Sequence, residues 1–181
     1  PETITQTDRQ QVSYLLDNNL QLTQGTHVFN FENKFTEHFL TPKHKSTFVN
    51  SGSSALMASI YALIINNNIS PGDNIIIPAL AWSTDIAPAI QFGLNPIICD
   101  CNLIDLSLDI KHLKHLINTY QPKVVICVSV LGIPPDMTSI SQLCKENNII
   151  LIEDVCESLG SKHNKQHLGT FSDIACFSFY Y

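Results

Sequence analysis

Short, continuous apolar runs alternate with helix-length amphipathic stretches from about residue 46 onward. The runs are rich in Ile and Val without strict polar alternation, as in "NIIIP" at 74–78, "KVVICVSV" at 123–130 and "IILIE" at 149–153. Strands that are buried on both faces have this pattern, because helices cover both sides of a parallel sheet. The sequence therefore predicts an α/β fold with a mostly parallel central sheet flanked by helices.

The spacing of apolar residues divides the chain into two parts. Residues 7–19 and 29–40 have helical spacing, and the strand-helix alternation follows them. We therefore expect an N-terminal helical segment over residues 1–45 and an α/β domain over residues 46–181. The predicted strands of that domain are residues 47–50, 74–78, 95–100, 123–130, 149–153 and 174–179, and its predicted helices are residues 53–66, 84–92, 109–119 and 138–147.

Composition excludes several classes of protein. The net charge is −6 and the ten Lys and Arg residues form no basic stripe, which argues against nucleic-acid binding. No apolar stretch approaches the roughly 18–20 residues of a transmembrane helix. The six cysteines form no C-x-x-C motif and resemble the reduced, buried thiols of a cytoplasmic protein. His112 and His115 could share a metal, but a solvated helix face is favoured because no further ligand is evident, so we expect no metal site.

The ends of the predicted strands carry the candidate site, because ligands of parallel sheets bind at the carboxyl ends of the strands. "SGSS" follows the first predicted strand, and Gly52, Ser53 and Ser54 lie where the next helix should begin. A helix N-terminus offers free N–H groups and a positive dipole end, which suit a phosphate. An ordinary serine cap is the alternative.

Three further strand ends carry polar or aromatic residues. Trp82 could stack on a flat ring or pack into the core. Asp154 could pair with a protonated ring nitrogen, as in pyridoxal phosphate enzymes, or could cap a helix or form a salt bridge. Ser178 could contact a phosphate or bond the backbone. The neighbouring Glu153 is expected to form a structural salt bridge. In order along the chain, these features indicate a phosphate-bearing aromatic ligand.

The chain resembles the pyridoxal 5'-phosphate (PLP)-dependent sugar-nucleotide aminotransferases named after DegT and StrS, which have fold type I. The likeness covers almost the whole sequence. It is carried by "LTQGTHVFNFENKF", "VNSGSSAL", "GDNIIIPALAWST", "GLNPIICDCNLIDLSLDI" and "LIEDVCESLGSKHNKQHLGTFSDIACFSFYY".

The resemblance implies a role for each candidate residue. Residues 52–54 would hold the phosphate of PLP or of pyridoxamine 5'-phosphate (PMP), with help from Ser178. Trp82 would cover one face of the pyridine ring, and Asp154 would keep the ring nitrogen protonated. Glu157 would lie near the ring hydroxyl or the substrate. The resemblance also implies a homodimer.

The sequence departs from the family pattern at two places. Ser129 stands where the family often has a histidine. The Schiff-base lysine, or the histidine that replaces it, is expected just beyond Tyr181, and no catalytic residue is visible within the chain. Lys162 and Lys165 precede Ser178 in a predicted hairpin loop and are poor substitutes. We therefore expect this chain to be the N-terminal half of a longer protein, without the small C-terminal domain and inactive alone.

The resemblance leaves three functions open. A lysine would make the protein an aminotransferase that moves the amino group of glutamate to a nucleotide-linked keto-sugar, for deoxyaminosugar, lipopolysaccharide or other cell-surface polysaccharide biosynthesis. A histidine would make it a PMP-dependent 3-dehydratase, which "EDVCES" and "SFYY" favour. Aminotransferases are the more frequent members of the family. A non-catalytic, ligand-binding relic on the same fold is the third alternative.

Overall fold

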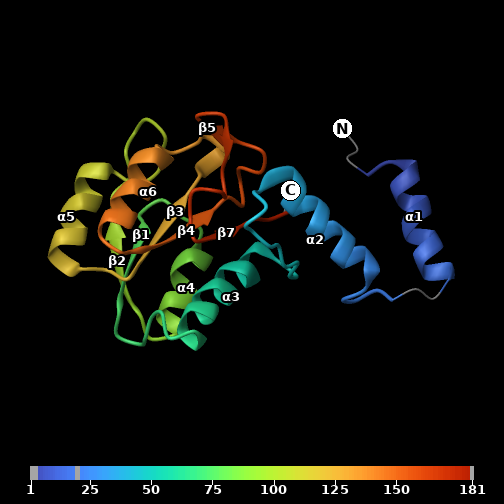
Figure 1. The fold of residues 1–181 in the computed structure, drawn as a ribbon, viewed down its shortest axis with the longest axis horizontal. Coiled ribbons are helices and arrows are strands. Elements are labelled where there is room, and N and C mark those ends of the chain that lie inside the picture. The colour runs from blue at the N-terminus through green and yellow to red at the C-terminus, as the bar shows by residue number, and fades with distance from the viewer. Residues whose placement is uncertain (1–3, 19–20, 180–181) are drawn as a thin grey trace. The chain divides into compact units, whose positions relative to one another are not determined.

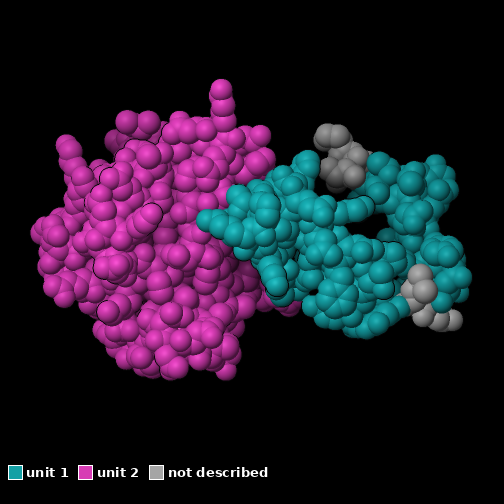
Figure 2. Space-filling view, viewed as in Figure 1, with its two compact units in different colours: residues 1–48 teal, residues 49–181 magenta. Residues whose placement is uncertain are grey.

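The computed structural model describes residues 4–18 and 21–179. The chain divides into two compact units, residues 1–48 and residues 49–181 (Figure 2). The expected boundary between residues 45 and 46 stays a prediction.

The first unit contains two helices, α1 (Gln6–Asp17) and α2 (Thr26–Phe39). In α2, the rings of Phe31, Phe35 and Phe39 follow one another every four residues, with centroid distances of 5.9 and 5.0 Å. This spacing places them on one face of the helix. Both helices predicted for this part of the chain are present.

The second unit is built on five parallel strands in the order β2-β1-β3-β4-β7 (Figure 1). The predicted fold class is therefore confirmed. The strands are β1 (Asn74–Pro78), β2 (Asn95–Cys99), β3 (Val124–Val128), β4 (Ile150–Asp154) and β7 (Ile174–Cys176). The helices are α3 (Gly52–Ile65), α4 (Ser83–Gln91), α5 (Ile110–Tyr120) and α6 (Met137–Glu146), with a short 3-10 turn η1 (Val130–Gly132) and a hairpin of β5 (Lys162–His163) and β6 (Gln166–His167).

Side chains that alternate along the strands fill two cores, one on each face of the sheet. On β1, Ile76 points into one core, whereas Ile75 and Ile77 belong to the other. Residues of α5 and α6 close the first core, and residues of α3 and α4 close the second (Figure 1). This double coverage explains why the strands read as continuous apolar runs.

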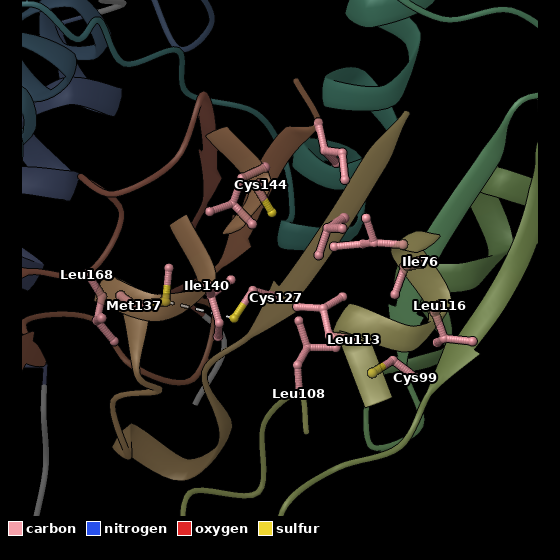
Figure 3. Packing of buried hydrophobic residues seen from close by; sticks show 14 of the residues in the cluster. Ile76, Cys99, Leu108, Leu113, Leu116, Cys127, Met137, Ile140, Cys144 and Leu168 are labelled. Atoms are coloured by element: carbon pink, nitrogen blue, oxygen red, sulfur yellow. Dashed lines mark hydrogen bonds between the residues drawn. The ribbon is translucent and has the colours of Figure 1, made fainter. Parts of the chain in front are cut away.

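The first core includes cysteines as apolar residues (Figure 3). The Cys127 sulfur lies 3.8 Å from the Met137 sulfur. Burial raises the pKa of the Cys144 thiol to about 12, so it stays protonated. All six cysteines are free thiols.

Two strand predictions need correction. Residues 47–50 form no strand, and β7 ends at Cys176 rather than at residue 179. The Phe48 ring packs edge-on against the Phe31 ring, with centroids 5.3 Å apart. The Phe48 backbone N–H donates to the Glu32 carboxylate at 2.7 Å. This N–H is therefore not available for a sheet ladder. Within the described part of the chain, no helix has the length and apolar character needed to cross a membrane.

Candidate functional site

The N-terminus of α3 is capped by a serine, as the alternative interpretation of the sequence expected, and the capping residue is Ser51. Ser51 precedes the helix, and its hydroxyl oxygen accepts a hydrogen bond from the Ser54 N–H at 3.1 Å. The Ser51 and Ser54 hydroxyls are also 3.1 Å apart. Gly52 is the first helical residue and is buried, whereas Ser53 is exposed. The cap occupies the Ser54 N–H, so an anion at this helix end would contact the N–H groups of Gly52 and Ser53 and the serine hydroxyls.

Gly52 brings this helix end against the residues that follow β4 and β7. A Cβ atom at Gly52 would lie 2.8 Å from the Cys156 sulfur and 3.0 Å from the Ser178 Cβ. Real Cβ atoms do not approach other atoms so closely, so the site requires glycine. The structure therefore brings together two of the predicted phosphate contacts, the turn at residues 52–54 and Ser178.

Asp154 ends β4 at the carboxyl edge of the sheet. It pairs with Val128 of β3 on one side and with Cys176 of β7 on the other, and its side chain is 4% exposed. Its Oδ1 atom accepts a hydrogen bond from the Cys156 N–H at 2.8 Å. A buried carboxylate with a single backbone donor is poorly compensated, which favours a further partner at this position.

Glu153, the preceding acid, has a structural role that differs from the expected salt bridge. It is fully buried, and its Oε2 atom accepts the Gly169 N–H at 2.8 Å. Its Oε1 atom accepts the Phe171 N–H at 2.9 Å and the Ser172 hydroxyl at 2.8 Å. Burial raises the pKa of Glu153, against the opposing effect of these hydrogen bonds. The carboxylate therefore fixes the loop that leads into β7.

A second buried acid, Asp85, lies beside Asp154. It belongs to the first turn of α4 and is 0% exposed. Neither of its carboxyl oxygens has a hydrogen-bond partner among the described residues. Burial raises the pKa of Asp85 to about 8, and the neighbouring Asp154 contributes to the rise. Its signal in the sequence is the acid of "AWSTD", which lies between the predicted strand at 74–78 and the predicted helix at 84–92, close to Trp82.

Trp82 lies in the segment that follows β1, and Glu157 lies in the loop that follows β4. Trp82 precedes α4 and is 67% exposed, so core packing does not explain it. Glu157 is exposed, and its Oε2 atom accepts the Leu131 N–H at 2.8 Å. Leu131 has a left-handed backbone with φ of 52°, so Glu157 holds the turn after β3. Between described residues, no hydrogen bond joins Trp82 or Glu157 to Asp154.

Ser129 occupies the position at which a histidine was considered. It is 0% exposed, and its hydroxyl oxygen has no hydrogen-bond partner among the residues that the structure describes. Its N–H donates to the Asp154 carbonyl at 3.0 Å, and its carbonyl accepts the Ser158 hydroxyl at 2.6 Å. Lys162 and Lys165 lie in the β5–β6 hairpin, as the sequence predicted.

The histidines considered as metal ligands have other roles. The rings of His112 and His115 stack with centroids 6.4 Å apart, and the His112 Nδ1 atom accepts the Asp100 N–H at 3.0 Å. In residues 4–18 and 21–179, no group of three or more His, Cys, Asp or Glu side chains is placed to hold a metal ion.

Comparisons with known proteins point to one family. The model of the DegT/DnrJ/EryC1/StrS aminotransferase family matches residues 2–181. GDP-4-keto-6-deoxy-D-mannose 3-dehydratase of Yersinia pseudotuberculosis is 33% identical over 172 residues, which cover 94% of this chain and 43% of the relative. GDP-perosamine synthase of Escherichia coli O157:H7 is 32% identical over 177 residues, which cover 98% of this chain and 47% of the relative.

A solved structure gives the same result. Escherichia coli GDP-4-keto-6-deoxy-D-mannose-3-dehydratase with bound hydrated PLP superimposes with a TM-score of 0.92 at 32% identity, and the match covers 100% of this chain and 46% of that chain. This chain therefore spans less than half the length of the relatives it matches.

Proposed function

The chain belongs to the DegT/DnrJ/EryC1/StrS aminotransferase family, and we propose that the protein that carries it is a PLP-dependent aminotransferase of nucleotide-linked keto-sugars. Its amino donor would be glutamate, and its product would serve deoxyaminosugar or cell-surface polysaccharide biosynthesis. We place it in the cytoplasm, because its buried free thiols suit a reducing compartment, and we expect it to act as a homodimer.

The observation that carries this proposal is the convergence of three groups at one edge of the sheet. The N-terminus of α3 and Ser178 meet at Gly52, which also lies against the Cys156 sulfur. The Cys156 N–H donates to the Asp154 carboxylate two residues earlier in the chain. A phosphate fits the N–H groups of Gly52 and Ser53 and the hydroxyls of Ser53, Ser54 and Ser178. A protonated ring nitrogen fits Asp154, because its positive charge would compensate the buried carboxylate.

The remaining candidate residues would complete the cofactor site. Bound PLP supplies an electron sink that stabilises carbanions, and a protonated ring nitrogen strengthens it. Asp154 would hold the proton at that nitrogen, and Trp82 would cover one ring face and exclude water. Glu157 would present its carboxylate near the ring hydroxyl or the substrate while holding the turn at Leu131.

A second function has specific support. The matched proteins include 3-dehydratases, among them the structure with a TM-score of 0.92, and "EDVCES" favours this branch. Such an enzyme would use PMP to remove the sugar 3-hydroxyl, with a histidine as acid or base in place of the lysine. The GDP-perosamine synthase is almost equally similar, so identity alone does not separate the two reactions.

Cofactor absorbance tests the common part of the proposal. We expect full-length protein to shift the visible absorbance of added PLP, and Asp154→Ala to abolish this shift or weaken it severely. Asp17→Asn, which changes an exposed carboxylate of α1, is the matched control and should behave as wild type. Wild-type protein that leaves the PLP spectrum unchanged would contradict the proposal.

Borohydride reduction then separates the alternatives. A lysine that forms a Schiff base with PLP becomes covalently labelled on reduction, whereas a histidine cannot form that bond. Label retained through denaturation supports the aminotransferase. Bound PLP that is released on denaturation supports the dehydratase, or the non-catalytic relic if no sugar is turned over.

A further inference from the structure

We propose that the outer side of α3 is the centre of an interface between two copies of this chain. Its exposed side chains Met57, Tyr61 and Ile65 are called the α3 face below. The proposal rests on the proposed function, because it gives the homodimer expected there a contact surface. That surface lies on the helix that begins at the proposed phosphate turn.

The α3 face is apolar, exposed and uncharged. Met57, Tyr61 and Ile65 are 41%, 51% and 57% exposed, and they recur every four residues along one side of the helix. All residues of α3 are uncharged, whereas a helix that faces water carries charged or polar residues on that side. A helix that is apolar nearly all round is normally covered on every side. A further surface is therefore expected to cover the α3 face.

The α3 face is also held in place before any partner binds. On the opposite side of the helix, Leu56 and Ile60 are buried in the core that α3 and α4 close on the sheet (Figure 1). The Tyr61 ring stacks on the ring of Phe92, at the end of α4, with centroids 5.6 Å apart and an angle of 28° between the rings. A fixed aromatic ring loses little conformational entropy on binding, which suits the centre of an interface.

The order of the side chains suits a two-fold axis. Met57 and Ile65 are each four residues from Tyr61. If two α3 helices cross antiparallel at Tyr61, each Met57 lies opposite the partner's Ile65, as a two-fold interface requires. The uncharged helices do not repel each other, and the antiparallel order brings opposite ends of their dipoles together.

The part of the protein that follows Tyr181 is the alternative cover for the α3 face. This chain spans 43% and 47% of two of its relatives, so a second half of similar length is expected. Interfaces between domains of one chain are more polar than those of permanent dimers, whose centres are apolar and depleted of charged residues. The uncharged α3 face therefore favours a second copy.

An interface on α3 would also stabilise the proposed phosphate turn. Gly52 begins α3, and its close approach to Cys156 and Ser178 requires the helix end to stay in place. A helix moves as a rigid element, so a partner that holds its middle also restrains its first turn. We therefore expect loss of the dimer to weaken PLP binding.

Sedimentation velocity of the full-length protein tests the interface. We expect wild type to sediment as a dimer, and Tyr61→Glu to raise the dimer dissociation constant about tenfold or more. Tyr120→Glu is the matched control, because Tyr120 is 45% exposed and ends α5, which covers the other face of the sheet. A monomeric wild type, or Tyr61→Glu that dimerises as tightly as wild type, would overturn the proposal.

Met57 and Ile65 test the antiparallel order, and they keep the test decisive if Tyr61→Glu does not fold. Met57→Lys or Ile65→Glu alone would bury an unpaired charge and should weaken the dimer. In the double variant, the new lysine of each copy would lie opposite the new glutamate of the other, so part of the affinity should return. The two positions are eight residues apart, too far to pair within one helix. Losses that add without recovery would overturn the two-fold arrangement.

Two further readouts separate the other outcomes. Tyr61→Glu that lowers the free energy of unfolding without weakening the dimer would show that the part after Tyr181 covers the α3 face, and would overturn the proposal. A wild-type dimer that is weakened by Tyr61→Glu but leaves the PLP spectrum unchanged would defeat the proposed function and leave the interface standing. We expect Tyr61→Glu to weaken PLP binding in dilute protein, and Tyr120→Glu to bind PLP as wild type does.

Discussion

Glu153 and Asp154 show how adjacent acids acquire different tasks from the geometry of a strand. Successive side chains of a strand point to opposite faces, so the two carboxylates enter different environments. Glu153 is satisfied by three donors of the loop at residues 169–172. Asp154 has one backbone donor and a second acid as its neighbour. The first carboxylate is therefore structural, and the second is available for a cation.

Replacement of Glu153 by glutamine tests its structural task. The amide group would turn its own donors toward one of the N–H groups of Gly169 and Phe171, which would leave that N–H unpaired. We expect Glu153→Gln to lower the free energy of unfolding by about 1–3 kcal/mol in urea titrations. Glu37→Gln, at an exposed position of α2, should leave it unchanged. Equal stability of the two variants would contradict the structural role.

Gly52→Ala tests the close approach of α3 to the ends of β4 and β7. The new Cβ atom would meet the Cys156 sulfur at 2.8 Å, so the helix end must shift away from Ser178. We expect weaker PLP binding in fluorescence titrations, partly restored by the additional change Cys156→Ala. Gly25→Ala, at the start of α2, is the control, because its Cβ would lie 3.4 Å from the nearest side chain. Unaltered affinity in Gly52→Ala would argue against the phosphate turn.

Asp85 also predicts how stability depends on pH. The pKa of Asp85 rises from 3.8 to about 8 on folding. The stabilisation of the folded state that follows from this rise is therefore fully present below pH 3.8 and is lost as the pH rises toward 8. Each pKa unit corresponds to about 1.4 kcal/mol. We expect urea midpoints to fall between pH 5 and pH 8.5 in wild type and to fall less in Asp85→Asn. We attribute any pH dependence of the urea midpoint that remains in Asp85→Asn to Glu153, because burial also raises the pKa of Glu153.

At the scale of elements, sequence patterns predict best where local and tertiary preferences agree. The limits of β1 match the prediction because Ile75, Ile76 and Ile77 are buried on both faces of the sheet. The strand expected over residues 47–50 is absent, since Phe48 finds its partners in α2 instead. Such a choice between partners depends on distant residues and cannot be obtained from a four-residue run.

In the candidate site, too, the sequence predicted local features and missed features that depend on tertiary packing. The start of α3 near Gly52 was predicted because a buried helix that follows a turn has a fixed start. The phosphate contacts of residues 52–54 stay a prediction. Asp85 was missed because its burial depends on how α4 packs against α3, β1 and β2, which a local sequence pattern does not show. A serine cap was expected as an alternative, but its identity as Ser51 depends on the residue at which α3 begins.

The loop that Glu153 holds supports β7 as an element, and Gly169→Ala tests this support. Gly169 has φ of +88°, and a Cβ atom there would overlap the Phe177 ring. Phe177 precedes Ser178, so displacement of the ring should reach the proposed phosphate contact. We expect a lower unfolding midpoint together with weaker PLP binding. Loss of stability with unchanged affinity would show that the loop does not position Ser178.

At the scale of the whole molecule, all the proposed cofactor contacts lie in the second unit, residues 49–181. They would hold the phosphate and the ring nitrogen, which the proposed aminotransferase and 3-dehydratase reactions would both need. The lysine or histidine expected after Tyr181 would decide between the two reactions. The described part of the chain therefore supports the cofactor more directly than it supports the chemistry performed on the sugar.

The fate of the glutamate nitrogen distinguishes the two reactions in the full-length protein. An aminotransferase moves this nitrogen to the sugar, so nitrogen-15 glutamate and a nucleotide-linked keto-sugar should give a sugar product that carries the label. A 3-dehydratase removes the sugar hydroxyl, and its product contains no nitrogen from glutamate. Mass spectrometry of the isolated sugar nucleotide measures this difference. We expect the labelled product, and Asp154→Ala should reduce its rate severely, because Asp154 would hold the proton on the cofactor ring in either reaction.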